Sequence, residues 1–488
     1  MADKLMANNE WIGKALTAQG WKQLRGGSID VIEPATGHTL SRVAKANVQD
    51  MRLACEAARA AQKQWAALPY QARAALLRKA AAELEASRED YATWIVRETG
   101  GIVPKAMFEI DSVLHHLHEA AAMLTQAKGL VLPSAEGVTS LARRVPHGVV
   151  GVISPFNFPF LLSSRAVLPA LACGNAVVLK PDPRTPISGG VLLAMLLRTA
   201  GVPDGVFQML PGEAEAGEAL VTDPDVAMIS FTGSTAVGRR VGELAGKHLK
   251  KVALELGGKN ALIVLPDADL DLAVCGATWA SYLHQGQICM SAGRHLVHKD
   301  LVDAYTERLV EKAKALPVGN PHTEPVALGP LITAKQAARV QALVDESVRM
   351  GAVVLAGGRA RGLFYPATVL THVTPKMPIF REEIFGPVIA ITAFDSDEQA
   401  IELANDTEYG LSAGVHTANL ARGMAIAERL HVGLVHVNDQ TVNDDGTMPM
   451  GGRGASGNGS RHGGPANWDE FTQWQWTTIR SQAPQYPL

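Results

Sequence analysis

Strands and helices alternate through the middle of the chain, and this alternation limits the possible folds more than any other feature of the sequence. Val149–Ile153 is an uncharged run typical of a buried strand, Phe160–Cys173 has helical spacing and is followed by Gly174, and Ala176–Lys180 is a second buried strand. The pattern continues with a helix over 187–200, a strand over 206–210, a helix over 214–222 and a strand over 226–231. Such an alternation predicts a doubly wound parallel α/β sheet, which binds ligands at the carboxyl ends of its strands. This part of the chain is therefore a candidate nucleotide-binding domain.

The whole chain, at 488 residues, is too long for one ordinary core and fits two or three domains. Its remaining segments predict a hairpin over 28–45, two or three helices over 48–100, another helix over 105–128, and further αβ units that reach about residue 438. Residues 131–145 look extended, and Phe471–Ile479 alternates in polarity and is β-prone. A strand at the end of a chain is either a sheet edge or a pairing surface for another subunit.

Charge and cysteine content argue against several classes of function. The formal net charge is −3 with both signs scattered, so we expect neither a nucleic-acid nor a membrane-surface partner. The four cysteines lie far apart, which predicts no disulfide framework, no zinc site and a reducing compartment. His115, His116 and His118 have no carboxylate or cysteine at matching spacing, so we interpret them as a solvated helix face and predict no metal.

We find no targeting signal and no membrane-spanning segment in the sequence pattern. The first residues have no apolar segment followed by a small-residue cleavage site, and the uncharged stretch over 145–164 is interrupted by prolines. We therefore expect a soluble protein of the cytoplasm.

A phosphate-binding turn is predicted at Phe231–Gly238, which follows a strand and begins a helix. Gly233 permits a tight turn, and Ser234 and the helix N-terminus offer donors to a pyrophosphate, although an ordinary serine-capped turn has the same pattern. The GxGxxG match at Gly452–Gly457 precedes more glycine instead of a helix, so we interpret it as a loop.

Two residues suggest covalent chemistry. Cys289 lies on a turn between a helical run over 270–284 and a β-type run over 294–298, where a thiol can stand free beside backbone N–H groups. Taken alone, an unpaired cysteine is more often a small buried hydrophobe. Glu255 ends a strand beside Gly257 and Gly258, which suits a general base or, alternatively, a structural ion pair.

Six short motifs together resemble those of the aldehyde dehydrogenase superfamily, in the family's order and approximate spacing. They are Pro155–Pro159, Lys180–Pro181, Phe231–Gly238, Glu255–Lys259, Gly286–Cys289 and Glu383–Pro387. The resemblance implies a cofactor domain over 1–126 and 147–256, a catalytic domain over 257–456, both doubly wound, and a small β oligomerisation extension over 127–146 and 466–488. It also implies a homodimer or homotetramer.

The resemblance implies a role for each matching residue. Cys289 would be the nucleophile, Asn157 and the Cys289 amide would hold the oxyanion, and Glu255 would activate the water that hydrolyses a thioester. Lys180 and Glu383 would bind ribose, and Phe385 would lie beside the nicotinamide. The full set of expected cofactor contacts is Ser154, Lys180, Gly212, Phe231, Gly233, Ser234, Val237, Leu256, Gly257, Glu383 and Phe385.

Cofactor choice is left open by one departure from the family pattern. Where NAD-dependent members often carry a glutamate, this chain has Pro183 followed by Arg184, which could accept a 2′-phosphate. We expect NAD, with NADP possible.

The substrate resemblance is to benzaldehyde dehydrogenases, through Gly286–Ser291, Lys180–Thr185 and Val437–Asn443. The family's Pro-Phe-Gly-Gly is here Pro449–Gly452, which changes one pocket wall. Alternatives are an aliphatic aldehyde or semialdehyde as substrate, an acylating enzyme that passes the thioester to coenzyme A, and a non-catalytic protein. The expected pocket is apolar, with Arg165 as a possible cation near its mouth, and comprises Phe158, Leu161, Leu162, Arg165, Leu283, Ile288, Met290 and Met450.

Overall fold

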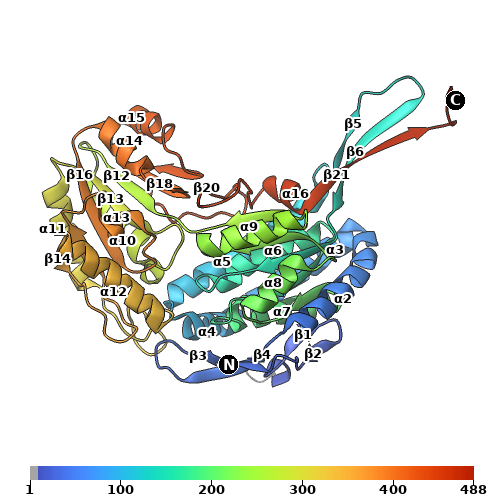
Figure 1. Ribbon diagram of the computed structural model, residues 1–488, viewed down its shortest axis with the longest axis horizontal. Helices are drawn as coiled ribbons and strands as arrows, with labels where there is room; N and C mark the ends of the chain where they lie inside the picture. The colour runs from blue at the N-terminus through green and yellow to red at the C-terminus, as the bar shows by residue number, and fades with distance from the viewer. Residues whose placement is uncertain (1–8, 488) are drawn as a thin grey trace.

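The computed structural model describes residues 9–487 and contains two seven-stranded sheets and a three-stranded arm (Figure 1). The first sheet has the order β11-β10-β7-β8-β9-β1-β2. Its parallel strands are β7 (Val149–Ile153), β8 (Ala176–Lys180), β9 (Phe207–Met209), β10 (Val226–Thr232) and β11 (Lys251–Glu255), and the antiparallel β1 (Ala15–Thr17) and β2 (Gly20–Lys22) complete it. The predicted doubly wound parallel sheet is confirmed.

Helices cover both faces of this sheet. Alternate side chains of each strand point to opposite sides, so the buried strands contribute apolar side chains to a core on each face. Val150 and Val152 of β7 belong to one core cluster, and Val149 and Ile153 belong to another. The first cluster includes residues of α3 (Tyr70–Ala86), α4 (Arg88–Thr99), α5 (Val103–Ala122), α6 (Pro159–Ala172) and α7 (Leu192–Ala200). The second includes residues of α2 (Val48–Ala67), α8 (Ala214–Thr222) and α9 (Thr235–Lys247).

The second sheet has the order β14-β15-β16-β13-β12-β18-β19, and β14 is antiparallel to its neighbour. Its strands are β12 (Asn260–Val264), β13 (Ala292–His298), β14 (Val353–Ala356), β15 (Thr368–Thr371), β16 (Val388–Phe394), β18 (Ser412–His416) and β19 (Leu434–Val437). One face packs on α10 (Leu270–Tyr282) and α11 (Val302–Ala315). The other packs on α12 (Ala334–Arg349), α13 (Pro378–Arg381), α14 (Asp397–Asn405) and α15 (Leu420–Ala427).

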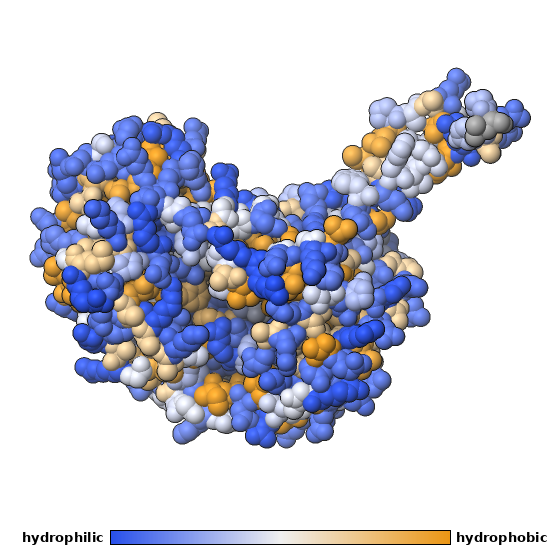
Figure 2. All heavy atoms as spheres, viewed as in Figure 1, coloured by the Kyte–Doolittle hydropathy of each residue, from blue (hydrophilic) through white to orange (hydrophobic). Residues whose placement is uncertain are grey.

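A three-stranded antiparallel arm projects from the body, as Figures 1 and 2 show. It has the order β21-β6-β5 and comprises β5 (Gly129–Leu132), β6 (Val138–Pro146) and β21 (Thr472–Arg480). The predicted extended segments at 131–145 and 471–479 therefore pair with each other. The predicted hairpin over 28–45 is β3 (Ser28–Ile32) with β4 (Thr39–Ala44).

Three predictions about helices need correction. The helix expected over 187–200 begins with a π-helical turn, η3 (Ile187–Val191), and becomes α-helical only at Leu192. The helix expected over 105–128 ends at Ala122 and a 3-10 turn. His116 is buried, so the prediction that all three histidines lie on a solvated face is wrong for this residue. No described helix is both long and apolar enough to cross a membrane.

Candidate active site

The carboxyl ends of adjacent parallel strands bring the predicted residues of the first domain to one edge. Ile153 of β7 is in register with Lys180 of β8 and with Phe231 of β10, and Thr232 is in register with Glu255 of β11. The segments that follow these strands carry Ser154 and Asn157, so the sheet aligns both with Lys180 and Glu255. Residues that were predicted at the ends of separate strands thus lie along the same edge of the sheet.

The nucleophile turn has an unusual backbone. After α10 ends at Tyr282, a 3-10 turn, η4 (Leu283–Gly286), places His284 and Gln285 at φ values of 49° and 55°. These left-handed angles are rare for non-glycine residues. They indicate backbone strain, so contacts with the surrounding residues must stabilise this conformation. Gly286 continues the left-handed conformation at φ 66°, where a Cβ would collide with the Gly386 carbonyl. Cys289 follows this turn and is partly exposed.

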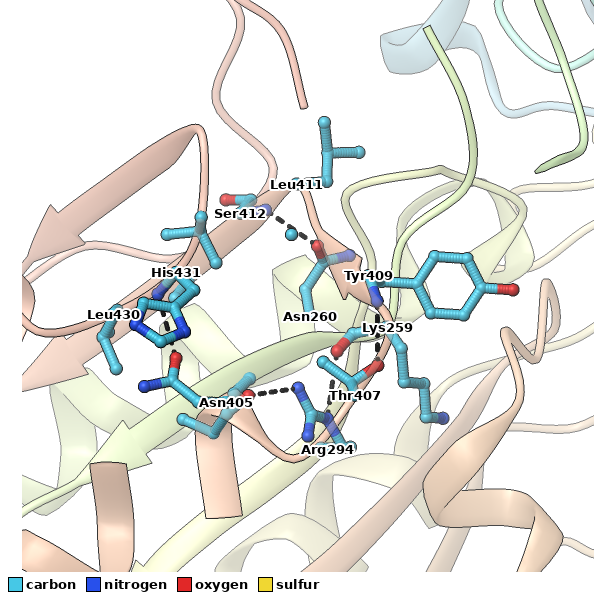
Figure 3. A pocket seen from close by; sticks show the side chains of 15 residues that line it. Lys259, Asn260, Arg294, Asn405, Thr407, Tyr409, Leu411, Ser412, Leu430 and His431 are labelled. Carbon is cyan, nitrogen blue, oxygen red and sulfur yellow. Dashed lines mark hydrogen bonds between the residues drawn. The ribbon is translucent and has the colours of Figure 1, made fainter. Parts of the chain in front are cut away.

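Asn260, which the sequence reasoning did not single out, holds the segment after Cys289. Its Nδ2 donates to the carbonyl oxygens of Cys289 (2.8 Å) and Ser291 (2.9 Å), and its Oδ1 accepts from the Ser412 amide at 3.0 Å. Figure 3 shows Asn260 beside Ser412 in a small cavity that Tyr409 and Arg294 also line. The position of Asn260 at the start of β12, just after the Glu255–Lys259 motif, was the available signal.

Arg294 supports the same region from β13. Its buried guanidinium donates to the carbonyls of Lys259, Leu403 and Ala404, at 3.0, 2.9 and 2.8 Å. Burial lowers the pKa of Arg294 to about 9. Because these partners are carbonyls, the arginine joins β12 to α14 without neutralising a carboxylate.

The Cys289 thiol lies in an apolar environment. Burial raises the pKa of Cys289 to about 12, and the nearby Arg165 guanidinium opposes this shift. Glu383 and Glu255 add smaller effects that raise the pKa of the thiol further. The resting thiol is therefore protonated at neutral pH, and a reaction must include its deprotonation.

Glu255 is buried at the end of β11. Burial raises the pKa of Glu255 to about 8, while Arg165 and Arg461 oppose the shift. Within residues 9–487, neither carboxylate oxygen has a hydrogen-bond partner of normal geometry, although the Gly452 amide lies close enough to lower the pKa slightly. A buried, unsatisfied carboxylate with a pKa near neutrality is suited to proton transfer.

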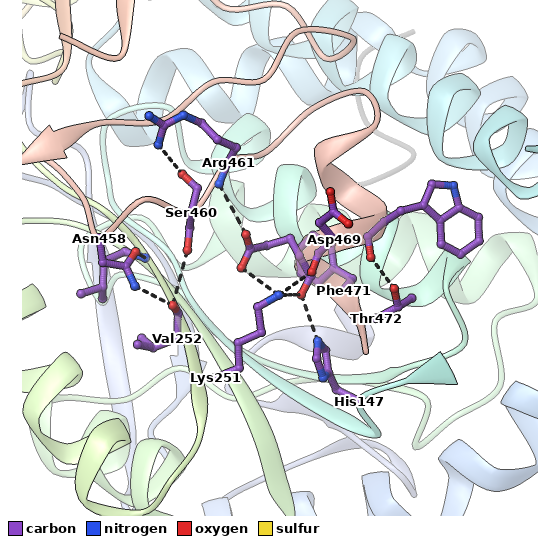
Figure 4. Close-up of polar contacts among 12 residues, drawn as sticks. His147, Lys251, Val252, Asn458, Ser460, Arg461, Asp469, Phe471 and Thr472 are labelled. Atoms are coloured by element: carbon purple, nitrogen blue, oxygen red, sulfur yellow. Dashed lines mark hydrogen bonds and ion pairs between the residues drawn. The ribbon is translucent and has the colours of Figure 1, made fainter. Parts of the chain in front are cut away.

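The glycine-rich segment over 452–457 lies along β11 and helps to hold Glu255. The Leu256 amide donates to the Ser456 carbonyl at 2.9 Å, and Asn458 bonds both the Leu254 amide and the Val252 carbonyl. Figure 4 shows Asn458 and Ser460 beside Val252. The segment does not precede a helix, as expected, but it includes the two-residue strand β20 (Arg453–Gly454), which pairs with β17 (Tyr409–Gly410).

The base of β11 is anchored to α16 (Ala466–Phe471). Lys251 Nζ donates to the carbonyls of Asp469 (2.5 Å) and Glu470 (2.7 Å) and is 3.3 Å from the Glu470 carboxylate, as Figure 4 shows. Both ends of the strand that carries Glu255 are therefore fixed by the C-terminal segment.

Asn157 is buried in the segment between β7 and α6. A side-chain amide can donate to a substrate oxygen. Ser154, in the same segment, is buried and accepts a 2.7 Å hydrogen bond from Ser163 Oγ.

Most of the predicted pocket residues share one large apolar cluster with Cys289. Seven of them pack in or against the apolar cluster that Cys289 also contacts: Phe158, Leu161, Leu162, Leu283, Ile288, Met290 and Met450. Phe108 of α5 was missed by the sequence reasoning. Its ring lies edge-on to Phe158 at 6.2 Å between centroids and is 40% exposed, so it reaches the same region from solvent.

Arg165 differs from its expected position as a free cation near a pocket mouth. It is buried, forms an ion pair with the buried Asp444, and donates to Met450 Sδ at 3.2 Å. Its charge is compensated by Asp444, so it offers less attraction to a substrate carboxylate than a free arginine would.

The first group of expected cofactor residues surrounds Lys180. Its Nζ is buried and donates to the Gly212 carbonyl at 2.8 Å. Burial lowers the pKa of Lys180, and Asp182 and Glu213 oppose that shift. Lys180 and Gly212, which lie far apart in sequence, are therefore direct neighbours.

The second group lies between the two sheets. Glu383 Oε1 accepts from the Gly258 amide at 3.0 Å, and a Cβ at Gly257 would collide with the same carboxylate. Phe385 adopts φ 54° and lies edge-on to Phe156, with centroids 5.7 Å apart. Leu256 is buried and fills the space beside Gly238.

The predicted phosphate-binding turn lies between β10 and α9. The Gly233 amide donates to the Glu255 carbonyl at 3.0 Å, so this N–H is not free for a phosphate, and Phe231 closes off the space behind it. Ser234 and Val237 are exposed, and Ser234 precedes α9 without capping it through its side chain. The N-terminus of α9 and the Ser234 hydroxyl remain available to an anion.

Arg184 is committed to protein partners. It donates to both carboxylate oxygens of Asp182, at 2.7 and 2.6 Å, and its guanidinium stacks 4.0 Å from the Phe156 ring centroid. A 2′-phosphate would have to compete with Asp182 for this arginine.

Comparisons with known proteins agree with this architecture. The profile of the Aldehyde dehydrogenase family matches residues 21–477. The chain is 52% identical to a benzaldehyde dehydrogenase [NAD(+)] of Pseudomonas putida, covering 98% of each chain, and 52% identical to a vanillin dehydrogenase of an Amycolatopsis species, covering 99% of each. Its fold matches an NAD+ complex of aldehyde dehydrogenase from Bacillus cereus with TM-score 0.95, 35% identity and 99% coverage of both chains.

The chain belongs to the aldehyde dehydrogenase family. It is thus an oxidoreductase with the fold that the motifs implied, which confirms the resemblance. An NADP-dependent enzyme of Escherichia coli is also similar in structure, with TM-score 0.94, 34% identity and coverage of 97% of this chain and 99% of the other.

Proposed function

We propose that this protein oxidises an aromatic aldehyde, such as benzaldehyde or a substituted benzaldehyde, to the carboxylic acid with NAD. The observation that carries the proposal is that Cys289 packs against an apolar cluster, while the nearby Arg165 is neutralised by Asp444. A flat apolar ring fits such surroundings, whereas a substrate carboxylate finds no free cation among the residues proposed for the pocket. The 52% identity to benzaldehyde and vanillin dehydrogenases supports the same substrate class.

The reaction begins with deprotonated Cys289, whose sulfur forms a bond to the aldehyde carbon. The carbonyl electron pair moves to oxygen, and the Asn157 amide and the Cys289 backbone N–H stabilise the charge that develops there. Bound NAD would supply the acceptor for the hydride. As the hydride leaves this carbon, the oxygen electron pair re-forms the carbonyl, and a thioester on Cys289 remains. Glu255 then takes a proton from water, whose oxygen adds to the thioester carbon, and the C–S bond breaks to return the Cys289 thiolate.

The residues present fit NAD. Lys180 and the Glu383 carboxylate would hold the ribose hydroxyls, and Phe385 would contact the nicotinamide. The N-terminus of α9 and Ser234 would hold the pyrophosphate. We propose NAD over NADP because Asp182 engages Arg184 and would repel a 2′-phosphate.

We also propose two domains, over 1–126 with 147–256 and over 257–456, and an oligomerisation arm over 127–146 and 466–488. The arm supports a homodimer or homotetramer because the outer edges of β5 and β21 have no strand partner among the described residues, and both strands bear exposed apolar side chains. We place the protein in the cytoplasm, which suits its free cysteines.

Initial rates of NAD and NADP reduction test the function. Purified protein is assayed with benzaldehyde, vanillin, a short aliphatic aldehyde and succinic semialdehyde, each with both cofactors. Preferred turnover of the aromatic substrates with NAD is expected. A preference for the semialdehyde would overturn the substrate class, and faster NADP reduction would overturn the cofactor choice.

A further inference from the structure

A buried carboxylate lies behind the segment that carries Asn157. Glu109 of α5 is fully buried, and its Oε2 accepts from the amides of Phe160 (3.0 Å) and Leu161 (3.1 Å) at the start of α6. The residue before α6, Phe158, cannot cap the helix with its own side chain. Glu109 therefore supplies from another helix the acceptor that α6 lacks at its N-terminus.

A second buried carboxylate acts in the same way on the segment after Lys180. Glu98 of α4 accepts from the amides of Ile187 (2.8 Å) and Ser188 (2.5 Å), which begin the π-helical turn η3. Pro186 precedes this turn and offers no side-chain cap. Glu98 thus fixes the end of the loop over 181–186, which follows the proposed ribose-binding lysine.

Lys105 connects the two carboxylates. It is buried, forms an ion pair with Glu109, and interacts electrostatically with Glu98. Its Nζ lies 4.6 Å from the centre of the Phe158 ring, next to Asn157. One lysine therefore partly balances two carboxylates that the chemistry of Cys289 and Glu255 does not use.

The connection between α4 and α5, residues 100–102, also contacts the turn η4 that precedes Cys289. The Gly100 carbonyl accepts from Gln285 Nε2 at 3.0 Å, and a Cβ at Gly101 would come within 3.1 Å of His284 Nδ1. Gln285 and His284 are the residues with left-handed angles before Cys289. The two helices and their connection therefore contact three segments of the site.

We infer that Glu109 and Glu98 are positioning residues with separate effects: Glu109 orients Asn157 through the start of α6, and Glu98 orients the Lys180 loop through η3. This inference rests on the proposed roles of Asn157 and Lys180. Loss of Glu109 then weakens stabilisation of the oxyanion, whereas loss of Glu98 weakens binding of the cofactor.

The full-length variants Glu109→Gln and Glu98→Gln test this separation. Removing a charge-assisted hydrogen bond of this kind changes an equilibrium or a rate by about tenfold to a hundredfold. Glu109→Gln should lower kcat by that factor and leave the Kd of NAD, measured by calorimetry, unchanged within about twofold. Glu98→Gln should raise the Kd of NAD by about tenfold and leave kcat at saturating NAD unchanged within about twofold.

Glu33→Gln is the matched control, because Glu33 is also a buried carboxylate paired with a cation, Arg97 at 2.8 Å, but contacts neither segment. It should change neither quantity. Glu109→Asp and Glu98→Asp retain the charge and should recover part of each loss, and they serve where a glutamine variant does not fold.

Equal changes of kcat and Kd in both variants, an exchange of the two effects, or no effect would overturn the inference. The comparison uses whichever aldehyde the wild-type protein oxidises. A wild type that prefers another aldehyde therefore contradicts the proposed substrate and leaves this separation testable.

Discussion

At the scale of single residues, burial sets the chemistry of the site. It raises the pKa of both Cys289 and Glu255, and Arg165 is the cation that opposes both shifts. Glu255 therefore changes its charge near pH 8, where a base for water is useful, whereas a solvent-exposed glutamate would be deprotonated far below that pH.

The pH dependence of deacylation follows from this raised pKa. Only deprotonated Glu255 accepts a proton, so the rate should rise with pH through a midpoint near 8 and level off only above it. Glu255→Gln should abolish this dependence and slow turnover by roughly a hundredfold or more, with a burst of NADH before the slow phase. Stopped-flow absorbance over pH 6 to 10, an interval of about two units on either side of the expected midpoint, measures both. A variant with the wild-type profile would remove Glu255 as the base.

Asn260 gives a second residue-scale prediction. In Asn260→Asp, a carboxylate would face the Cys289 and Ser291 carbonyls that now accept from Nδ2, and its charge would raise the pKa of the thiol. Alkylation by iodoacetamide at pH 8 should slow by about tenfold, a cost near 1.4 kcal/mol.

Asn405→Asp is its control. Asn405 also donates to a carbonyl, Arg429 at 3.0 Å, and accepts from an amide, His431 at 2.9 Å, but these hydrogen bonds do not involve the segment of Cys289. Equal alkylation rates in wild type and Asn260→Asp would show that Asn260 does not influence Cys289.

The roles of Cys289, Glu255 and Asn157 rest on short motifs that resemble those of the family, and these roles stay predictions. Contacts between residues that are far apart in the chain could not be predicted from residue type. The neutralisation of Arg165 by Asp444 joins positions 279 residues apart, and only the folded structure brings them together. The burial of His116 depends likewise on the packing of α5, not on its local pattern.

At the scale of elements, local patterns predicted most strands of the first sheet, and β7 and β8 match their expected bounds because uncharged β-branched runs between glycine or proline turns have few alternatives. The π-helical turn and the left-handed residues before Cys289 depend on partners elsewhere, Glu98 and the Gly100 carbonyl among them. Sequence periodicity carries no signal for such distortions.

Gly286→Ala tests the importance of the nucleophile turn as an element. Alanine at φ 66° costs about 1 kcal/mol, and its Cβ would collide with the Gly386 carbonyl, so the turn must shift. We expect kcat/KM to fall by at least about tenfold.

Gly13→Ala is the control for backbone strain alone, since Gly13 has φ 68° and open space around its Cβ position. It should lower the melting temperature slightly and leave kcat/KM unchanged. If both variants reduce kcat/KM equally, strain and not the shape of the turn is responsible.

At the scale of the whole molecule, the two sheets supply different parts of one site: the first carries Asn157, Lys180 and Glu255, and the second is joined to Cys289 and Glu383. The arm projects away from the body of the molecule, as Figure 2 shows. Its exposed side chains include Val131, at 80%, and Trp476, at 73%. Surface of this kind on a thin sheet with two open edges favours pairing with another subunit.

Val131→Lys tests that role of the arm. A lysine placed on this surface would have to be desolvated on assembly, so the variant should dissociate to a smaller species in gel filtration with light scattering. Leu272→Lys, at an exposed apolar position of α10 that is 65% accessible, is the matched control and should keep the wild-type mass. An unchanged mass for Val131→Lys, or a monomeric wild type, would contradict an assembly through the arm. Because Val131 is remote from the strand ends that carry the site, the dissociated variant should still bind NAD, which separates loss of assembly from loss of folding.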